Sequence, residues 1–304
     1  MNEFDFIARL TDFAGSGIEG IGDDAALFGD FFLVAKDIIA SDVHFLKSAP
    51  MDLIIHKLFT SNVSDIAAMG GTPLSVLFGI SADKDTDLAS IANAAKKASE
   101  FYGVKIIGGD TTESHNGLFF SLTIIGKKGQ NLLQRNGARN GDILYLSRPV
   151  GLSKAALENE LGKKYFPIEN LYHYKINAEK DVGIFLGSRP EVTAATDVSD
   201  GLGADTGRLA TMSDVKITID EKCLKFPCLS FLGNEDVDYA LSSGEEFALL
   251  FTVKKESAEN FEKDYLKNLG KAPLKIGQVS SGNGSFLLRK GSLIDISKKG
   301  YVHF

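Results

Sequence analysis

Apolar residues recur every three or four positions in two long segments of the first half of the chain, which predicts two amphipathic helices. The first spans 51–69 and ends at the glycines and proline of 70–73, whereas the second spans 87–102 and ends at Gly103. Shorter helices are expected at 2–14, 153–161 and near 176–187. The inward face of the helix at 51–69 is expected to carry Leu53, Ile54, Leu58, Ile66 and Met69.

Short apolar runs predict the β-strands. In the first half they lie at 31–35, where the strand is expected to end at Lys36-Asp37, at 74–80, at 104–107 just before Gly108-Gly109-Asp110, and at 118–125. In the second half they lie at 143–147, 215–219, 247–253, 275–279 and 285–289. Because strands alternate with helices, we expect a layered α/β or α+β fold.

A polar, glycine-rich stretch at 127–142 separates the two halves. The chain has 304 residues, which suits two domains of roughly 150 residues each. We therefore expect an N-terminal domain at 1–135 and a C-terminal α/β domain at 136–304.

The composition excludes several classes of protein. A net charge of −7 argues against a general nucleic-acid binder, which presents a basic surface. No uncharged apolar run approaches the roughly 20 residues that span a bilayer, and residues 1–5 lack the basic start of a secretory signal. We expect a cytoplasmic protein that binds neither nucleic acid nor membrane. Cys223 and Cys228 form no CxxC pair, so we interpret them as reduced thiols, with a disulfide between them left open.

The usual glycine-rich phosphate-binding motifs are missing from the sequence. No GxxxxGK[ST] P-loop occurs. The segment 15–20 matches GxGxxG, but a helix-like segment precedes it and Gly-Asp-Asp follows it, so we interpret it as a loop.

Aspartates, by contrast, recur at the ends of predicted strands beside small residues. Each of these alone is usually a turn residue or a helix cap. Asp65 differs, because it lies inside the helix predicted at 51–69, close to the inward stripe. A buried carboxylate without a cation is costly. The recurring aspartates are Asp23, Asp24, Asp37, Asp110, Asp197 and Asp200.

Magnesium is a good candidate for that cation, because Mg²⁺ prefers hard oxygen ligands and is commonly shared with phosphates. Phosphoryl transfer needs mainly charge neutralisation and alignment, which metal ions held by several carboxylates would supply without a P-loop. The sequence therefore predicts a magnesium-dependent enzyme that acts on the phosphates of a nucleotide.

Eight short motifs support a more specific interpretation. They are 20–26, 42–45, 62–70, 107–112, 135–142, 197–202, 244–250 and 300–304. Their ordered set resembles the thiamine-monophosphate kinase family, which belongs to the aminoimidazole ribonucleotide synthetase-like superfamily. The resemblance runs across almost the whole chain.

The resemblance implies a two-domain aminoimidazole ribonucleotide synthetase-like fold, in which the N-terminal domain binds ATP and Mg²⁺ and pairs in a homodimer. It implies direct in-line transfer of the γ-phosphate of ATP, the co-substrate, to thiamine monophosphate, giving thiamine diphosphate. Of the aspartates, Asp65, Asp110 and Asp200 would be catalytic. Several Mg²⁺ ions would be held by Asp24, Asp37, Asp65, Asp110, Asp197 and Asp200.

The resemblance also assigns the two substrates. ATP would be contacted by Gly109, Asp110, Arg135 and Ser199. Thiamine monophosphate would be contacted by His44, Glu245 and Tyr301, the last of which offers an aromatic face to the cationic thiazolium.

Structural roles stay open for four of these residues. His44 lies between Val43 and Phe45, where a histidine can be structural, and Arg135 can be a solvated loop cation. Tyr301 can anchor the core, and Glu245 can be a surface charge at the start of a strand.

The sequence departs from the family pattern at three places. Ala35 and Lys36 replace the small hydroxyl residues that usually precede the aspartate aligned with Asp37, and we hypothesise that the Lys36 ammonium replaces part of the charge of one metal ion. Asp42 replaces a glycine, and 243–247 reads Ser-Gly-Glu-Glu-Phe where Gly-Gly-Glu-Asp-Tyr is usual.

Two alternatives remain. One is another ATP-dependent enzyme of the superfamily, but hydrogenase maturation calls for a C-terminal cysteine where this sequence has His303-Phe304, and selenophosphate synthesis calls for a cysteine well before Cys223. The other is a non-catalytic nucleotide-binding regulator, which Lys36 would favour.

Overall fold

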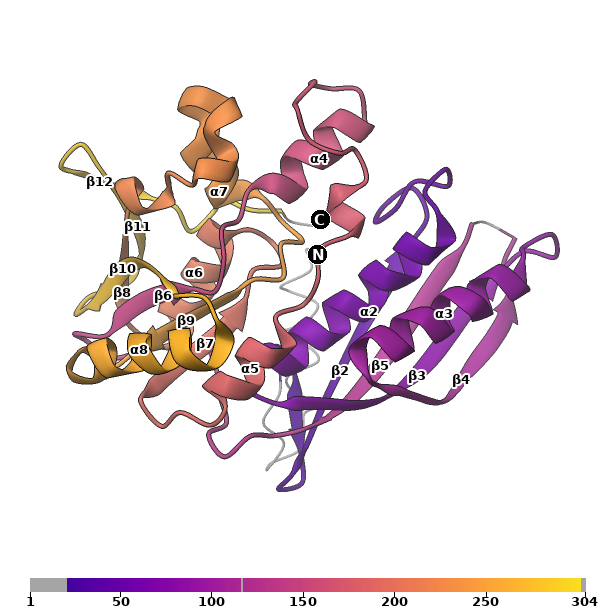
Figure 1. Cartoon of the computed structure of the whole chain (residues 1–304), viewed down its shortest axis with the longest axis horizontal. Helices are drawn as coiled ribbons and strands as arrows, with labels where there is room; N and C mark the ends of the chain where they lie inside the picture. The colour runs from indigo at the N-terminus through magenta and orange to yellow at the C-terminus, as the bar shows by residue number, and fades with distance from the viewer. Residues whose placement is uncertain (1–20, 116, 302–304) are drawn as a thin grey trace.

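The computed structural model describes residues 21–115 and 117–301, in which two β-sheets lie side by side with helices packed on them (Figure 1). The helix predicted at 2–14 and the glycine-rich segment 15–20 lie outside the described residues. No helix in the described ranges has both the length and the apolar character needed to cross a membrane.

The N-terminal sheet has five strands in the order β1-β2-β5-β3-β4. Helices α2 (Met51–Ala68) and α3 (Leu88–Tyr102) cover one of its faces (Figure 1). The helix α3 connects β3 to β4, which run parallel, whereas the other pairs are antiparallel. The strands are β1 (Ala26–Phe28), β2 (Phe32–Ala40), β3 (Thr72–Ala82), β4 (Lys105–Glu113) and β5 (Phe119–Lys127).

The C-terminal sheet has seven strands in the order β12-β11-β8-β10-β6-β9-β7. Its strands are β6 (Ile143–Leu146), β7 (Val192–Asp197), β8 (Lys216–Asp220), β9 (Leu249–Val253), β10 (Leu274–Ser280), β11 (Gly284–Arg289) and β12 (Ser292–Asp295). Its helices are α4 (Leu152–Glu160), α5 (Lys180–Leu186), α6 (Leu202–Met212), α7 (Asp236–Ser242) and α8 (Ala258–Leu269). Four 3₁₀ segments complete this half: η1 (Tyr172–Tyr174), η2 (Glu221–Leu224), η3 (Pro227–Glu235) and η4 (Lys255–Ser257).

The helix α2 packs into both halves of the molecule. Most of its buried side chains face the N-terminal sheet, but Ala67 at its end belongs to the same buried cluster as Tyr145 and Phe251 of the C-terminal sheet. A Cβ atom at Gly183 of α5 would lie 2.4 Å from the Ala67 carbonyl oxygen, so only glycine allows this close approach. The last turns of α2 are therefore held between the two halves.

Two predicted strand ends are wrong. Strand β2 continues through Lys36-Asp37 to Ala40, because the side chains alternate between the covered face, with Leu33 and Ile39 buried, and the opposite face. Strand β4, expected to end at residue 107, continues through Gly109 and Asp110 to Glu113, because this segment pairs with β3.

Other elements were shifted or missed. The helix predicted near 176–187 begins only at Lys180. Strand β7 was missed because it is built mostly from threonine and alanine, and α8 was missed because it buries only Ala258, Phe261 and Tyr265. The chain passes from one sheet to the other between Lys127 and Ile143, whereas the domain boundary after residue 135 stays a prediction.

Candidate active site between the two domains

Three of the predicted magnesium ligands converge although they are far apart in the sequence. Asp24 precedes β1, Asp65 lies in the last turn of α2, and Asp197 ends β7. One carboxylate oxygen of each lies within 4.8 Å of the others. The convergence places the end of α2 opposite the end of a strand from the other sheet.

Buried oxygen atoms at this cluster lack hydrogen-bond partners among the described residues. They are Oδ2 of Asp24, Oδ1 of Asp197 and Oδ2 of Asp37. A buried carboxylate oxygen without a partner is costly. Hard, partly unsatisfied oxygens at this spacing fit Mg²⁺, which binds carboxylates in this way.

The electrostatics of the cluster support the same interpretation. Burial raises the pKa of Asp65 well above its ordinary value, and the carboxylates of Asp37, Asp197 and Asp24 raise it further. Burial, followed by the charge of Asp24, also raises the pKa of Asp197 well above its ordinary value. The pKa values of Asp24 and Asp37 are raised as well, chiefly by burial. Repulsion of this kind is relieved when a cation binds.

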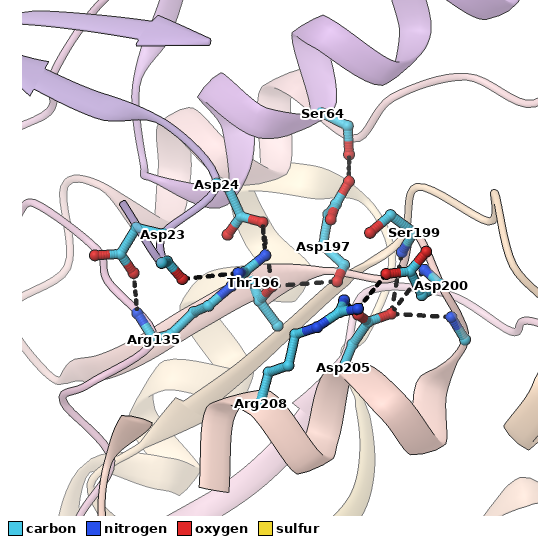
Figure 2. A network of polar contacts seen from close by, with 12 residues as sticks. Asp23, Asp24, Ser64, Arg135, Thr196, Asp197, Ser199, Asp200, Asp205 and Arg208 are labelled. Atoms are coloured by element: carbon cyan, nitrogen blue, oxygen red, sulfur yellow. Dashed lines mark hydrogen bonds and ion pairs between the residues drawn. The ribbon is translucent and has the colours of Figure 1, made fainter. Parts of the chain in front are cut away.

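Arg135 pairs with this cluster. Its guanidinium forms an ion pair with Asp24 and donates to the carbonyl oxygen of Gly22 at 2.8 Å and to Oγ1 of Thr196 at 3.1 Å (Figure 2). Its backbone N–H donates to Asp23 at 2.8 Å. The side chain therefore organises the aspartate loop, which excludes the solvated loop cation left open for it.

Asp205 holds the loop that carries Ser199 and Asp200. Its Oδ2 accepts hydrogen bonds from the backbone N–H groups of Ser199, Asp200 and Gly201 at 3.0 to 3.1 Å (Figure 2). Arg208 bonds both Asp205 and Asp200. Burial raises the pKa of Asp205 to about 7. We did not predict Asp205 from the sequence, although an aspartate in the first turn of a helix after Asp-Gly is a possible signal for it.

A cavity of about 550 Å³ opens beside the cluster. His44, Glu245 and Tyr301, the three residues expected to contact the acceptor, all line it. Asp37, Ser199 and Asp200 line it too. The cavity therefore joins the expected substrate residues to the edge of the carboxylate cluster.

Lys57 also lines this cavity and was missed by the sequence analysis. It lies in α2 and is 3% exposed. Its ammonium contacts both carboxylate oxygens of Glu245, at 2.6 and 2.7 Å. A lysine at a buried helical position is the signal that could have revealed it.

A second cavity, of about 620 Å³, lies on the other face of the N-terminal sheet and is lined by Gly109 and Asp110. In the strand register, Asp110 lies opposite Gly79, then Ser121, then Ile38. Asp110 is therefore three strand spacings, roughly 14 Å, from Ile38 across the sheet. Asp110 is not among the clustered carboxylates and lines the second cavity, although Ile38 lines both cavities.

Comparison with known proteins agrees with this geometry. Residues 22–127 match the AIR synthase related protein N-terminal domain, and residues 139–289 match the corresponding C-terminal domain. Thiamine-monophosphate kinase of Pyrococcus horikoshii is 33% identical over 93% of this chain and 90% of its own length. The chain belongs to the thiamine-monophosphate kinase family.

Other thiamine-monophosphate kinases match over nine-tenths or more of their length. The Bacillus subtilis protein is 32% identical over 100% of both chains. The solved structure of AaThiL complexed with AMPPCP and TMP matches with a TM-score of 0.84 at 31% identity, covering 100% of this chain and 97% of that one. The E. coli hydrogenase maturation protein HypE, at 21% identity and a TM-score of 0.70, shares the fold.

One departure from the thiamine-monophosphate kinase pattern has a structural explanation. Lys36 points to the face of the sheet opposite Asp37, where its ammonium contacts the hydroxyls of Ser121 and Thr123 and lines the second cavity. Burial raises the pKa of Asp37, and the Ser61 hydrogen bond and the charge of Lys36 each offset part of that rise. No direct contact between Lys36 and Asp37 accompanies the hypothesis that the Lys36 ammonium replaces part of the charge of one metal ion, which stays a prediction.

The glycine expected to bind ATP in the family pattern is also required by the backbone. Gly109 has φ 156°, and a Cβ atom there would lie 1.8 Å from the Phe78 carbonyl oxygen. The presence of glycine at 109 is thus explained by packing, and contact with ATP stays a prediction.

Proposed function

We propose that this chain transfers the γ-phosphate of ATP to thiamine monophosphate and forms thiamine diphosphate. One observation carries the proposal: the cavity that gathers His44, Glu245 and Tyr301 reaches the carboxylate cluster at Asp37. An acceptor bound there would direct its phosphate toward the metal-binding aspartates. The proposed site of action is the cytoplasm, where ATP is available.

The aspartates supply the negative charge that would bind metal ions in the site. Asp24, Asp37, Asp65 and Asp197 would hold magnesium, which when bound neutralises the phosphates of both substrates. Asp200 lies at the cavity wall and is oriented by Arg208. Because the acceptor is itself an ionised phosphate, direct in-line transfer needs alignment rather than a general base.

The other proposed contacts follow from the two cavities. His44, Glu245 and Tyr301 would hold thiamine, and Ser199 would contact ATP where its loop meets the cavity wall. Gly109 and Asp110 would contact the nucleotide from the second cavity, and Ile38 lines both cavities. Arg135 would act on ATP through the loop that it organises with Asp24.

We also propose that two copies pair through the uncovered face of the N-terminal sheet. Ile38, Leu77 and Phe119 on three of its strands are 37% to 56% exposed. All nine residues of the edge strand β4 are exposed. Exposed apolar side chains on an uncovered sheet face and an open strand edge favour pairing with a second copy.

The function is tested by incubating the protein with ATP, Mg²⁺ and thiamine monophosphate and measuring ADP and thiamine diphosphate. Equal amounts of the two products are expected, with no phosphorylation when unphosphorylated thiamine replaces the acceptor. ATP hydrolysis without thiamine diphosphate, or no consumption of ATP, would overturn the proposal.

A further inference from the structure

We propose that Lys57 is a positioning residue for the acceptor, which fixes Glu245 from one domain and His44 from the other within a single cavity. The proposal rests on the function proposed above. It is carried by the contacts of one ammonium group and by the backbone conformation of Glu245.

The Lys57 ammonium makes three short polar contacts. Nζ lies 2.6 Å from Oε1 and 2.7 Å from Oε2 of Glu245, and it donates to the carbonyl oxygen of His44 at 2.7 Å. The ring of Tyr174 lies beside it, with its centroid 5.4 Å from Nζ. One group in α2 therefore holds a residue that follows β2 and a residue that precedes β9.

These contacts distinguish positioning from direct binding of phosphate. A protonated lysine has three N–H donors. Three oxygen atoms of the described residues lie within hydrogen-bond distance of this ammonium. The donors are thus committed to Glu245 and His44, so Lys57 acts through these two residues.

Glu245 needs such a partner because its backbone is strained. It has φ 54°, and Phe247 two residues later has φ 51°. Residues other than glycine adopt positive φ at an energetic cost, and they persist there only when the surroundings hold them. The Glu245 N–H donates to the Ser199 carbonyl oxygen at 2.6 Å, and the Lys57 ammonium pairs with the Glu245 carboxylate. The Glu245 side chain is 32% exposed and lines the cavity.

His44 is held at both its ring and its backbone. Its Nδ1 accepts a hydrogen bond from the Ala40 N–H at 3.2 Å, so the proton of the neutral ring is on Nε2. Its backbone N–H donates to the Ala40 carbonyl oxygen at 2.9 Å, and its own carbonyl accepts from Lys57. Removing the Lys57 ammonium would take away one of the hydrogen bonds that hold the turn at His44.

The neighbouring Glu246 has a structural role that differs from the role of Glu245 in the cavity. Its Oε1 accepts hydrogen bonds from the backbone N–H groups of Gly151 and Ser153 at the start of α4, at 2.6 and 3.0 Å. Glu246 is 1% exposed and serves the fold. The positive φ at Glu245 turns the first glutamate toward the cavity while the second stays in the core.

The test is Lys57→Met, which removes the charge and keeps the length of the side chain. The KM for thiamine monophosphate is expected to rise by at least about tenfold, while the KM for ATP changes by less than about twofold. The matched control is Lys271→Met, because the Lys271 ammonium also contacts both oxygens of a glutamate, Glu179, at 2.7 and 2.9 Å, away from the cavity. Both KM values are expected to stay unchanged in the control.

Glu245→Gln keeps the proposal testable if Lys57→Met fails to fold, and it completes a double-mutant cycle if Lys57→Met folds. Glu245→Gln alone should raise the KM for thiamine monophosphate. In the double variant Lys57→Met/Glu245→Gln, this KM should be at most about threefold higher than in Glu245→Gln. Additive effects, or equal increases of both KM values, would overturn the positioning role. A wild-type protein that forms no thiamine diphosphate would instead overturn the proposed function.

Discussion

Ser64 Oγ donates a hydrogen bond of 2.6 Å to Oδ2 of Asp197, so a serine of α2 holds a carboxylate at the end of β7 (Figure 2). The next residue in α2 is Asp65, whose carboxylate approaches Asp197 in the carboxylate cluster. One helical turn therefore supplies both a proposed metal ligand and the hydrogen bond that orients another.

Loss of this hydrogen bond is expected to weaken the metal site. Ser64→Ala leaves a second oxygen of the buried Asp197 without its donor, which should cost about 1–3 kcal/mol of unfolding free energy. The concentration of Mg²⁺ needed for half-maximal activity should rise. Urea denaturation and Mg²⁺ titrations measure the two effects. The control is Ser188→Ala, since the Ser188 hydroxyl bonds the Phe185 carbonyl at an exposed site.

Asp65→Asn is expected to reduce turnover by at least ~100-fold, because the buried ligand set loses a charge. The same change should stabilise the metal-free protein. The folded-state pKa of Asp65 is raised, so ionisation of this group lowers the stability of the metal-free fold as the pH rises through that pKa, and asparagine removes the effect.

Two measurements on Asp65→Asn check this account. Its melting temperature without metal at pH 8 should exceed that of the wild type, and the increase on adding Mg²⁺ should shrink. Asp52→Asn, at an exposed ion pair in the first turn of α2, provides the control. Near-normal turnover in Asp65→Asn would contradict the metal-cluster account.

Asp110→Asn is expected to act differently, because Asp110 lies on the exposed strand β4, about three strand spacings from Ile38. Turnover should fall heavily, by ~100-fold, since the proposed contact with the metal–nucleotide complex is lost. The melting temperature without metal should stay within about 1 °C of the wild type, because no buried repulsion is relieved. Parallel kinetic and thermal measurements of Asp110→Asn and Asp65→Asn separate the two roles.

Leu77→Glu is expected to convert the proposed homodimer into monomers. Leu77 is 39% exposed on the uncovered face of the N-terminal sheet, and a carboxylate there would be buried when two copies pair. Sedimentation equilibrium measures the mass. Leu266→Glu, at a 51% exposed leucine of α8, is the control and should not change the oligomeric state. A wild-type protein that sediments as a monomer would contradict the pairing.

Acid should destabilise the protein through His173. Burial, and then the charge of Lys57, lowers the pKa of this histidine to about 4 from 6.5. The folded state therefore resists protonation, so stability is complete above pH 6.5 and falls as the pH drops toward 4. At ~1.4 kcal/mol per pH unit, the loss is about 3 kcal/mol.

The pH dependence is checked by urea denaturation of the wild type and of His173→Phe between pH 7 and 4. The aromatic ring should keep the packing against Tyr174, whose ring centroid lies 4.0 Å from that of His173. The variant should lose about 3 kcal/mol less than the wild type over this interval. Parallel curves for the two proteins would show that His173 is not responsible.

Local sequence patterns predicted much of the fold. The stripe of apolar residues at 51–69 and the capping residues Asp87 and Gly103 identified α2 and α3, because helix periodicity and termination depend on nearby residues. The ends of β2 and β4 were misplaced, since polar and glycine residues inside a strand are tolerated when the neighbouring strand supplies the hydrogen bonds. That information lies in the partner strand.

The sequence by itself determined the chemistry of the site: the carboxylates, the absence of a P-loop, and the unusual place of Asp65 inside a helix. The tertiary structure decided which of these groups meet. It brought Asp24, Asp65 and Asp197 together, placed Asp110 apart, and joined Lys57 to Glu245. Such juxtapositions depend on how α2 packs between two sheets, and contacts between residues more than a hundred positions apart leave no periodic signal along the chain.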